Sequence, residues 1–116
     1  MKKGAHPKLS IEALERLHLL LHQMQVNPGS DYRIRTLMKQ LQLDRSKLCY
    51  CFKQLTGYSV HRYVIKNRME AGKKLLEASN KPIKEIALIC GYKSHDKFSH
   101  AFKKYFRNAP SAVRNK

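Results

Sequence analysis

The chain has 116 residues, enough for one domain, and 42% of them are hydrophobic, so it can form a core and wholesale disorder is excluded. Lys and Arg number 24 against 8 Asp and Glu, a formal net charge of +16, of which residues 32–116, with 20 basic and 5 acidic side chains, hold +15. This charge predicts a polyanionic partner, and because no apolar run reaches the ~18–20 residues that cross a bilayer, an integral membrane protein is excluded.

The N-terminal part of the chain is predicted to be a tail followed by one helix. Residues 1–9 form a basic tail or linker, without the apolar stretch of a signal peptide. Ser10 is expected to cap a helix over residues 11–25, because apolar side chains recur there at helical spacing. The expected inward side chains are Ile11, Leu14, Leu17, Leu21 and Met24. His18 and His22 lie four positions apart on this helix, but without a third ligand we interpret them as surface residues and predict no metal site.

Two short helices are predicted next. A break at residues 27–31 ends in Asp31, the expected cap of a helix over residues 33–42. A tight turn at residues 43–45 leads into a second helix over residues 46–56, with inward side chains Leu48, Cys51, Phe52 and Leu55. Gly57 is expected to end that helix in the left-handed conformation.

A long helix and a further pair of short helices complete the chain. Ser59 begins a helix that extends to about Ala78. It contains Gly72, which costs up to ~1 kcal/mol relative to Ala unless it permits a close helix contact. Pro82 suits the start of a helix over residues 83–90, Ser94 caps a helix over residues 95–106, and Pro110 opens a last turn. The apolar residues of these helices include Ile83, Ile86, Ala87 and Ile89, then Phe98, Ala101, Phe102 and Tyr105, of which Phe98, Ala101 and Phe102 are expected to face inward. The predicted fold class is all-α, with about seven helices.

An internal repeat is the most informative pattern. The segment that begins at Ile34, IRTLMKQLQLDRSKLCYCFKQL, aligns in sequence with the segment that begins at Ile83, IKEIALICGYKSHDKFSHAFKKY. Ile34 corresponds to Ile83 before the turn and Phe52 to Phe102 after it, since the turn of the second copy is longer by a single position. Each unit is two short helices joined by a tight turn, which predicts two helix-turn-helix units around the shared long helix.

A helix-turn-helix presents its second helix to the major groove of DNA, so the outward residues of that helix are the candidate contacts. In the first unit they are Ser46, Lys47, Cys49, Tyr50 and Lys53. In the second unit they are His95, Asp96, Lys97, Ser99, His100, Lys103 and Lys104. Cys51 and Cys90 are interpreted as small core residues, and the odd number of three cysteines without a repeated CxxC pair argues against a disulfide framework and favours a reducing cytosol. No nucleophile with a base and no phosphate-binding glycine loop is present, so an enzyme is not predicted.

The sequence resembles the DNA-binding domain of the AraC/XylS family of bacterial transcription regulators over roughly residues 31–114. PIKEIALICGYKSHDKFSHAFKKYF, with Pro110 and Arg114 after it, is similar to the family signature, and FKQLTGYSVHRYVIKNRMEAGKKLL resembles the pattern of the linking helix. KLCYCF and the helix at residues 11–25 also resemble PchR-like members, which answer iron–siderophore signals. Tyr50 departs from the Arg that members often carry there, Gln42 and Arg107 depart from common Gly residues, and Gly72 departs from the usual Ala.

The resemblance implies that both second helices enter successive major-groove segments of double-stranded DNA. It implies base contacts for Ser46, Cys49, Tyr50, His95, Asp96, Ser99 and His100. We assign phosphate contacts to the flanking basic residues Arg33, Arg35, Arg45, Lys47, Lys53, Lys97, Lys103 and Lys104. Asp96 has a second interpretation, because an acidic residue near a helix N-terminus is favoured by the helix dipole alone. No cofactor is expected.

The expected organisation is a tail at residues 1–9 and one domain at residues 10–116. Its first lobe covers about 10–58, its linking helix about 59–78 and its second lobe about 79–116. We expect the domain to bind DNA as a monomer in the bacterial cytoplasm, associated with the nucleoid. RNA polymerase is the expected partner of an activator, and the full-length protein is expected to be able to dimerise through an upstream domain. Two alternatives stay open: a basic helical module that binds acidic proteins, and an RNA-binding module, which the scarcity of exposed aromatic residues disfavours.

Overall fold

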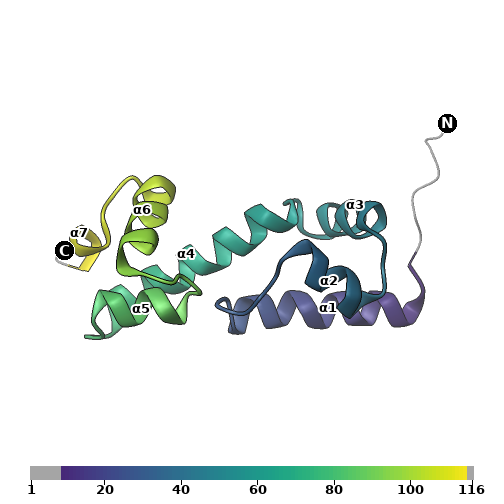
Figure 1. The fold of residues 1–116 in the computed structure, drawn as a ribbon, viewed down its shortest axis with the longest axis horizontal. Coiled ribbons are helices and arrows are strands. Elements are labelled where there is room, and N and C mark those ends of the chain that lie inside the picture. The colour runs from purple at the N-terminus through teal and green to yellow at the C-terminus, as the bar shows by residue number, and fades with distance from the viewer. Residues whose placement is uncertain (1–8, 115–116) are drawn as a thin grey trace.

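The computed structural model describes residues 9–114, which form seven α-helices and no β-strand (Figure 1). The predicted all-α fold class is therefore confirmed. The tail expected at residues 1–9 lies, except for Leu9, outside the described residues. Within the described part of the chain, no helix is both long and apolar enough to cross a membrane.

The first lobe consists of α1 (Ile11–Val26), α2 (Ile34–Leu41) and α3 (Arg45–Thr56). Ser10 caps α1 as predicted, with its hydroxyl accepting a hydrogen bond from the Ala13 N–H at 3.0 Å. Asp31 does not cap α2. The N-cap residue is Arg33, whose side chain makes no capping bond, and the Asp31 carboxylate accepts hydrogen bonds from the Arg33 N–H and the Thr36 hydroxyl, both at 3.0 Å.

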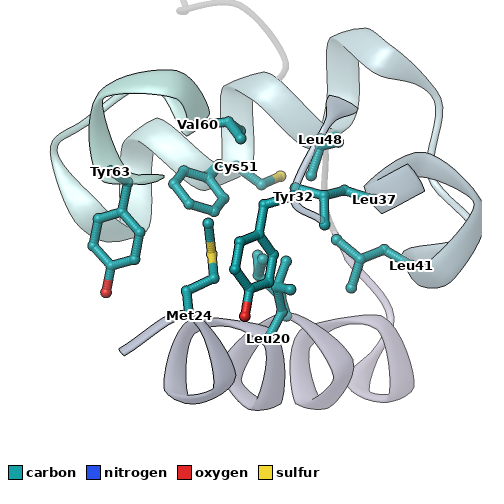
Figure 2. Packing of buried hydrophobic residues seen from close by; sticks show 11 residues of the cluster. Leu20, Met24, Tyr32, Leu37, Leu41, Leu48, Cys51, Val60 and Tyr63 are labelled. Atoms are coloured by element: carbon teal, nitrogen blue, oxygen red, sulfur yellow. The ribbon is translucent and has the colours of Figure 1, made fainter. Parts of the chain in front are cut away.

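The core of the first lobe is formed by apolar side chains from all three of its helices. Figure 2 shows Leu20, Met24, Leu37, Leu41 and Leu48 converging between α1, α2 and α3. All five are at most 1% exposed, and full burial of a side chain of this size contributes roughly 1.5–3 kcal/mol.

The long helix α4 (Val60–Ala78) belongs to both halves of the molecule. The hydroxyl of Ser59 accepts a hydrogen bond from the Arg62 N–H at 3.2 Å and caps the helix where the sequence predicts it. Val60 and Tyr63 pack into the core of the first lobe, whereas Met69 and Leu76 pack into a second core. Among the buried residues of the described chain, the two cores share none.

The second lobe consists of α5 (Ile83–Ile89), α6 (His95–Phe106) and α7 (Pro110–Arg114). Pro82 is the N-cap of α5, one position before the first helical turn where it was expected. Phe98 and Phe102 of α6 are fully buried. An ideal Cβ on Gly72 would lie 2.8 Å from Cζ of Phe98, so this glycine lets the Phe98 ring pack against the backbone of α4, the close contact that would justify a glycine inside a helix.

Several apolar residues predicted to face inward are exposed. Ile11 is 75% exposed, because the stripe that α1 buries is made of Ala13, Leu17, Leu20 and Met24 and shares only Leu17 and Met24 with the predicted one. Leu14 and Leu55, which also belong to the expected apolar stripes, are 39% and 44% exposed, and the apolar residues Ile89 and Tyr105 are 41% and 42% exposed. Helical spacing reveals an apolar stripe, but a helix buries only the part of that stripe that neighbouring elements cover.

The molecule is elongated, with extents of 52 × 27 × 21 Å. In Figure 1, α3 and α6 lie along the upper edge, α1 and α5 along the lower edge, and α4 runs diagonally between the two lobes.

Candidate nucleic-acid interface

The repeat seen in the sequence is present as two equivalent helix pairs, α2 with α3 and α5 with α6. Asp44 caps α3 through the Lys47 N–H at 2.8 Å, and Ser94, at the equivalent position of the second unit, caps α6 through the Lys97 N–H at 3.2 Å. Both second helices lie on the same edge of the molecule, one in each lobe (Figure 1). Each pair therefore has the layout of a helix-turn-helix.

The outward side of α3 is only partly accessible. Ser46 is exposed, whereas Cys49 and Tyr50 are half-buried. The Tyr50 ring packs against the core of the first lobe, so part of its apolar surface is already used within the fold.

The outward side of α6 is more exposed and more polar. His95, Asp96 and His100 are exposed, and Ser99 is half-buried. Nδ1 of His95 lies 3.8 Å from Oδ1 of Asp96, and its Nε2 lies 3.5 Å from the Ser99 hydroxyl oxygen. The His95 ring thus lies near both neighbours on the helix, while the Asp96 side chain is fully exposed.

The eight predicted phosphate contacts are distributed over both lobes. Seven are exposed and Lys47 is half-buried. Arg33 differs from the rest because it is engaged within the protein: its guanidinium donates to both oxygens of Asp31, at 3.0 and 2.9 Å. The hydrogen bond from this guanidinium, followed by that from the Arg33 N–H, holds the pKa of Asp31 well below its usual range.

A basic groove lies between α4 and α6 and was not predicted from the sequence. It has a volume of about 490 Å³, and its charged lining residues are Arg62, Lys66, Lys104 and Arg107, beside Tyr58 and Tyr105. Of these only Lys104 was predicted as a contact. Burial alone would lower the pKa of Lys66, but the hydrogen bond and charge of Glu70, together with smaller effects of Tyr58 and Tyr105, more than offset this and raise it. The helical spacing of Arg62 and Lys66, four positions apart on the linking helix, was the available signal.

The cysteines and histidines form no metal centre in the described chain, where no group of three potential ligands comes together. Cys51 and Cys90 are buried, as expected of core residues, and Cys49 is half-buried on α3. Burial raises the pKa of Cys90 to about 11, against a smaller opposing effect of the Arg68 charge. His18 and His22 are exposed on α1.

Arg114, the last residue of the signature pattern, has a structural place. Its Nη2 donates to the Ser79 carbonyl at 3.0 Å and its Nε to the Leu76 carbonyl at 3.3 Å, and its Nη1 bonds the Lys81 carbonyl. These bonds tie α7 to the end of α4 within the second lobe.

Comparisons with known proteins agree with this architecture. A family model described as "Helix-turn-helix domain" matches residues 37–116. The Msm operon regulatory protein of Streptococcus mutans serotype c is 37% identical over 86 residues, which are 74% of this chain and 31% of that protein. The C-terminal domain of AraT, a response regulator from Geobacillus stearothermophilus, is 28% identical, with a TM-score of 0.76 over 94% of this chain and 88% of that one.

One solved structure with the same fold contains nucleic acid. The DNA-binding domain of AdpA, described as a global transcriptional factor in complex with a target DNA, superposes with a TM-score of 0.76 and 24% identity over 91% of this chain and 92% of that one. This likeness concerns the fold. The chain spans about a third of the length of the curated relatives that it matches first. Since the family match covers most of the chain and the signature residues lie within it, the chain belongs to the AraC/XylS family of helix-turn-helix transcription regulators.

Proposed function

We propose that residues 10–116 act as a sequence-specific DNA-binding domain of a bacterial transcription regulator, which inserts α3 and α6 into successive major-groove segments. The observation that carries the proposal is the presence of two equivalent second helices on one edge of an elongated molecule (Figure 1). Two helices in successive grooves on one DNA face are about 34–36 Å apart, and a molecule 52 Å long can span that distance.

The second helix-turn-helix is the better candidate for reading bases. His95 and His100 can donate to the N7 or O6 acceptors of guanine, and Asp96 can accept from the N4 amino group of cytosine. In the first unit we assign base contacts to Ser46, Cys49 and the half-buried Tyr50. The role proposed for the flanking basic residues is to hold the DNA backbone, which sets position without reading sequence.

The proposed groups of contacts can be separated by measuring specific and random DNA in parallel. A binding site is first selected from random duplex DNA with the wild-type chain. We expect His100→Ala to lose roughly 5- to 150-fold in affinity for that site, equivalent to about 1–3 kcal/mol, with little loss on random duplex. Lys103→Ala should weaken the affinity for the selected site and the affinity for random duplex by about the same factor, because it removes only a contact with the DNA phosphates.

Lys74→Ala is the matched control for the loss of one positive charge. Lys74 is exposed on α4, two positions beyond the buried Gly72 and hence ~200° around the helix from that core-facing position. It should change both affinities less than Lys103→Ala does. An unchanged ratio of specific to random affinity in His100→Ala would overturn the base-reading role. Equal binding to heparin and DNA without any selected site would favour an acidic protein as partner, and a preference for single-stranded RNA over duplex DNA would favour an RNA-binding module.

We infer that the domain works in the cytoplasm as a monomer and without catalysis. Binding involves no chemical step, so no catalytic role is proposed, and the expected compartment is the bacterial cytoplasm, where the chromosome lies. We propose that the domain binds as a monomer, since both helix-turn-helix units are present in one chain, and that an activating full-length protein contacts RNA polymerase. Analytical ultracentrifugation of the complex with one selected site tests the stoichiometry: two chains per site would contradict it.

A further inference from the structure

Arg68, at the middle of α4, makes hydrogen bonds to the first lobe. Its Nε donates to the carbonyl of Pro28 at 3.0 Å and its Nη2 to the carbonyl of Ser30 at 3.1 Å. Both carbonyls lie in the loop between α1 and α2. Hydrogen bonds from a charged donor are stronger than those from a neutral one, and the planar guanidinium fixes their directions.

The same guanidinium contacts the second lobe. Its Cζ lies over the ring of Tyr92, 5.6 Å from the ring centroid, a geometry that is favourable for a cation on an aromatic face. Tyr92 follows α5 and packs edge to face against Phe98 of the second core, with ring centroids 5.8 Å apart. One side chain thus joins the loop of the first lobe to the core of the second.

Two glycines bring the backbones of the lobes together at this place. Gly91 has φ +94°, and an ideal Cβ on it would lie 2.9 Å from both the Cα of Gly29 and the Cζ of Arg68. An ideal Cβ on Gly29 would collide with the carbonyl oxygen of Ile89. No side chain fits at either position without moving the lobes apart, so the contact depends on both residues being glycine.

The apolar cores of the two lobes are separate clusters. The first core and the second core have no buried residue in common. A cleft of about 960 Å³ separates the lobes beside Arg68, with Val60 and Val64 on one side and Tyr92 and His100 on the other. Besides the continuous helix α4, the Arg68 contacts and the close approach of Gly29 to Gly91 therefore join the two lobes beside this cleft.

We propose that Arg68 and the Gly29–Gly91 contact form an interlobe latch that sets the separation and angle of α3 and α6, and thereby the number of base pairs required between the two half-sites. This inference rests on the function proposed above. One base pair changes the separation of two half-sites by about 3.4 Å and their relative rotation by about 35°. A protein with the latch contacts in place should tolerate such a change of spacing poorly, whereas a protein without them can adapt by bending at α4.

The first experiment measures tolerance to spacing. Wild-type and Arg68→Lys chains are titrated with the selected site and with the same site carrying one base pair inserted between its halves. The wild type should lose about tenfold or more on the insertion, comparable to the cost of one mismatched base pair. Arg68→Lys keeps the charge but cannot make the two hydrogen bonds of the planar guanidinium. The spacing ratio, which is the affinity for the selected site divided by that for the site with the insertion, should therefore fall to about threefold or less.

Arg114→Lys is the matched control. Arg114 also bonds backbone carbonyls, those of Leu76, Lys81 and Ser79, but all of them belong to α4 and the segment after it and none to the first lobe. Its replacement should leave the spacing ratio at the wild-type value. As a second test, Gly29→Ala, which leaves the charge unchanged, should shift the preferred spacing, because its methyl group pushes the loop away from Ile89.

The second experiment examines the latch without DNA. Spin labels are placed at His18→Cys on α1 and Lys84→Cys on α5, both exposed positions, in a Cys49→Ser background, and the distance between them is measured by pulsed electron resonance. Arg68→Lys should broaden the distance distribution and Arg114→Lys should not. An unchanged distribution in both Arg68→Lys and Gly29→Ala would overturn the latch.

The two experiments fail in different ways. A broadened distance distribution with an unchanged spacing ratio would overturn the role of the latch in spacing. If the distribution broadens but even the wild-type chain selects no duplex site, the proposed function is wrong and the spacing role falls with it, while the latch itself stands.

Discussion

At the scale of single residues, Asp31 is an acidic group in a surface otherwise suited to a polyanion. Its carboxylate accepts three hydrogen bonds from the backbone and guanidinium of Arg33 and one from the hydroxyl of Thr36. These bonds favour the ionised form, which lowers the pKa of Asp31. The stabilisation is present above the ordinary pKa of a carboxyl group and is lost only as the pH falls through the lowered value, so the pair stays intact at neutral pH.

We therefore predict that Asp31→Asn strengthens binding to duplex DNA. The amide oxygen can still accept from the Arg33 N–H, but the negative charge disappears and the guanidinium is released for a phosphate. Affinity should rise several-fold at moderate salt, and the slope of log affinity against log salt should steepen by up to ~0.9, the value for one added phosphate contact. Fluorescence anisotropy with a labelled duplex at several salt concentrations measures both. Weaker binding in Asp31→Asn would mean that the carboxylate orients Arg33 toward the DNA.

At the scale of elements, the two repeat units end their helices with different residue types at equivalent positions. α3 ends at Gly57 with φ +79°, and α6 ends at its counterpart Arg107 with φ +68°. Gln42, with φ +57° after α2, is equivalent to Gly91 of the second unit, with φ +94°. The left-handed conformation is imposed by the turn in both units, although only one unit has glycine at each place.

Gln42→Gly should accordingly stabilise the protein by about 1 kcal/mol, because the left-handed conformation costs roughly 1–2 kcal/mol for a residue with a Cβ and part of that gain is offset by the greater flexibility of an unfolded glycine. Gly57→Ala should destabilise it by a similar amount, since no heavy atom lies within 4 Å of an ideal Cβ there and backbone strain alone remains. Urea unfolding followed by circular dichroism measures both changes. A change of the same sign in the two variants would show that turn conformation does not dominate.

The sequence predicted the helices well because their ends are marked by local chemistry. Ser10, Ser59 and Ser94 cap helices where predicted, and these caps act on N–H groups only three positions further along the chain. Burial was predicted less well, as the exposed Ile11 and Leu55 show, because it depends on which neighbours cover a helix. The contacts of Arg68 with Pro28 and Ser30 join segments that are distant in the chain. No local pattern encodes such contacts, so they could be found only in the folded molecule.

At the scale of the whole molecule, charge and shape act on different parts of binding. Of the formal net charge of +16, residues 32–116 hold +15, and they include both helix-turn-helix units and the groove lined by Arg62, Lys66 and Arg107. Charge of this kind attracts any nucleic acid and releases its counterions. We propose that discrimination comes instead from the few polar side chains of α3 and α6 and from the distance between these helices, which a flexible molecule could not hold constant.

Because charge is proposed to supply the affinity that does not depend on sequence, the complex with DNA should depend strongly on salt. If ~6–10 phosphates are neutralised, affinity for duplex DNA should fall by roughly 10³–10⁵ between about 50 and 200 mM salt. Lys104→Ala and Arg107→Ala, which remove cations from the groove, should each reduce the slope by up to ~0.9, whereas His100→Ala should leave it nearly unchanged. Titrations at four salt concentrations with specific and random duplexes measure the slopes. A flat salt dependence would contradict the phosphate contacts altogether, and slopes unaffected by either groove variant would show that the groove faces away from the DNA.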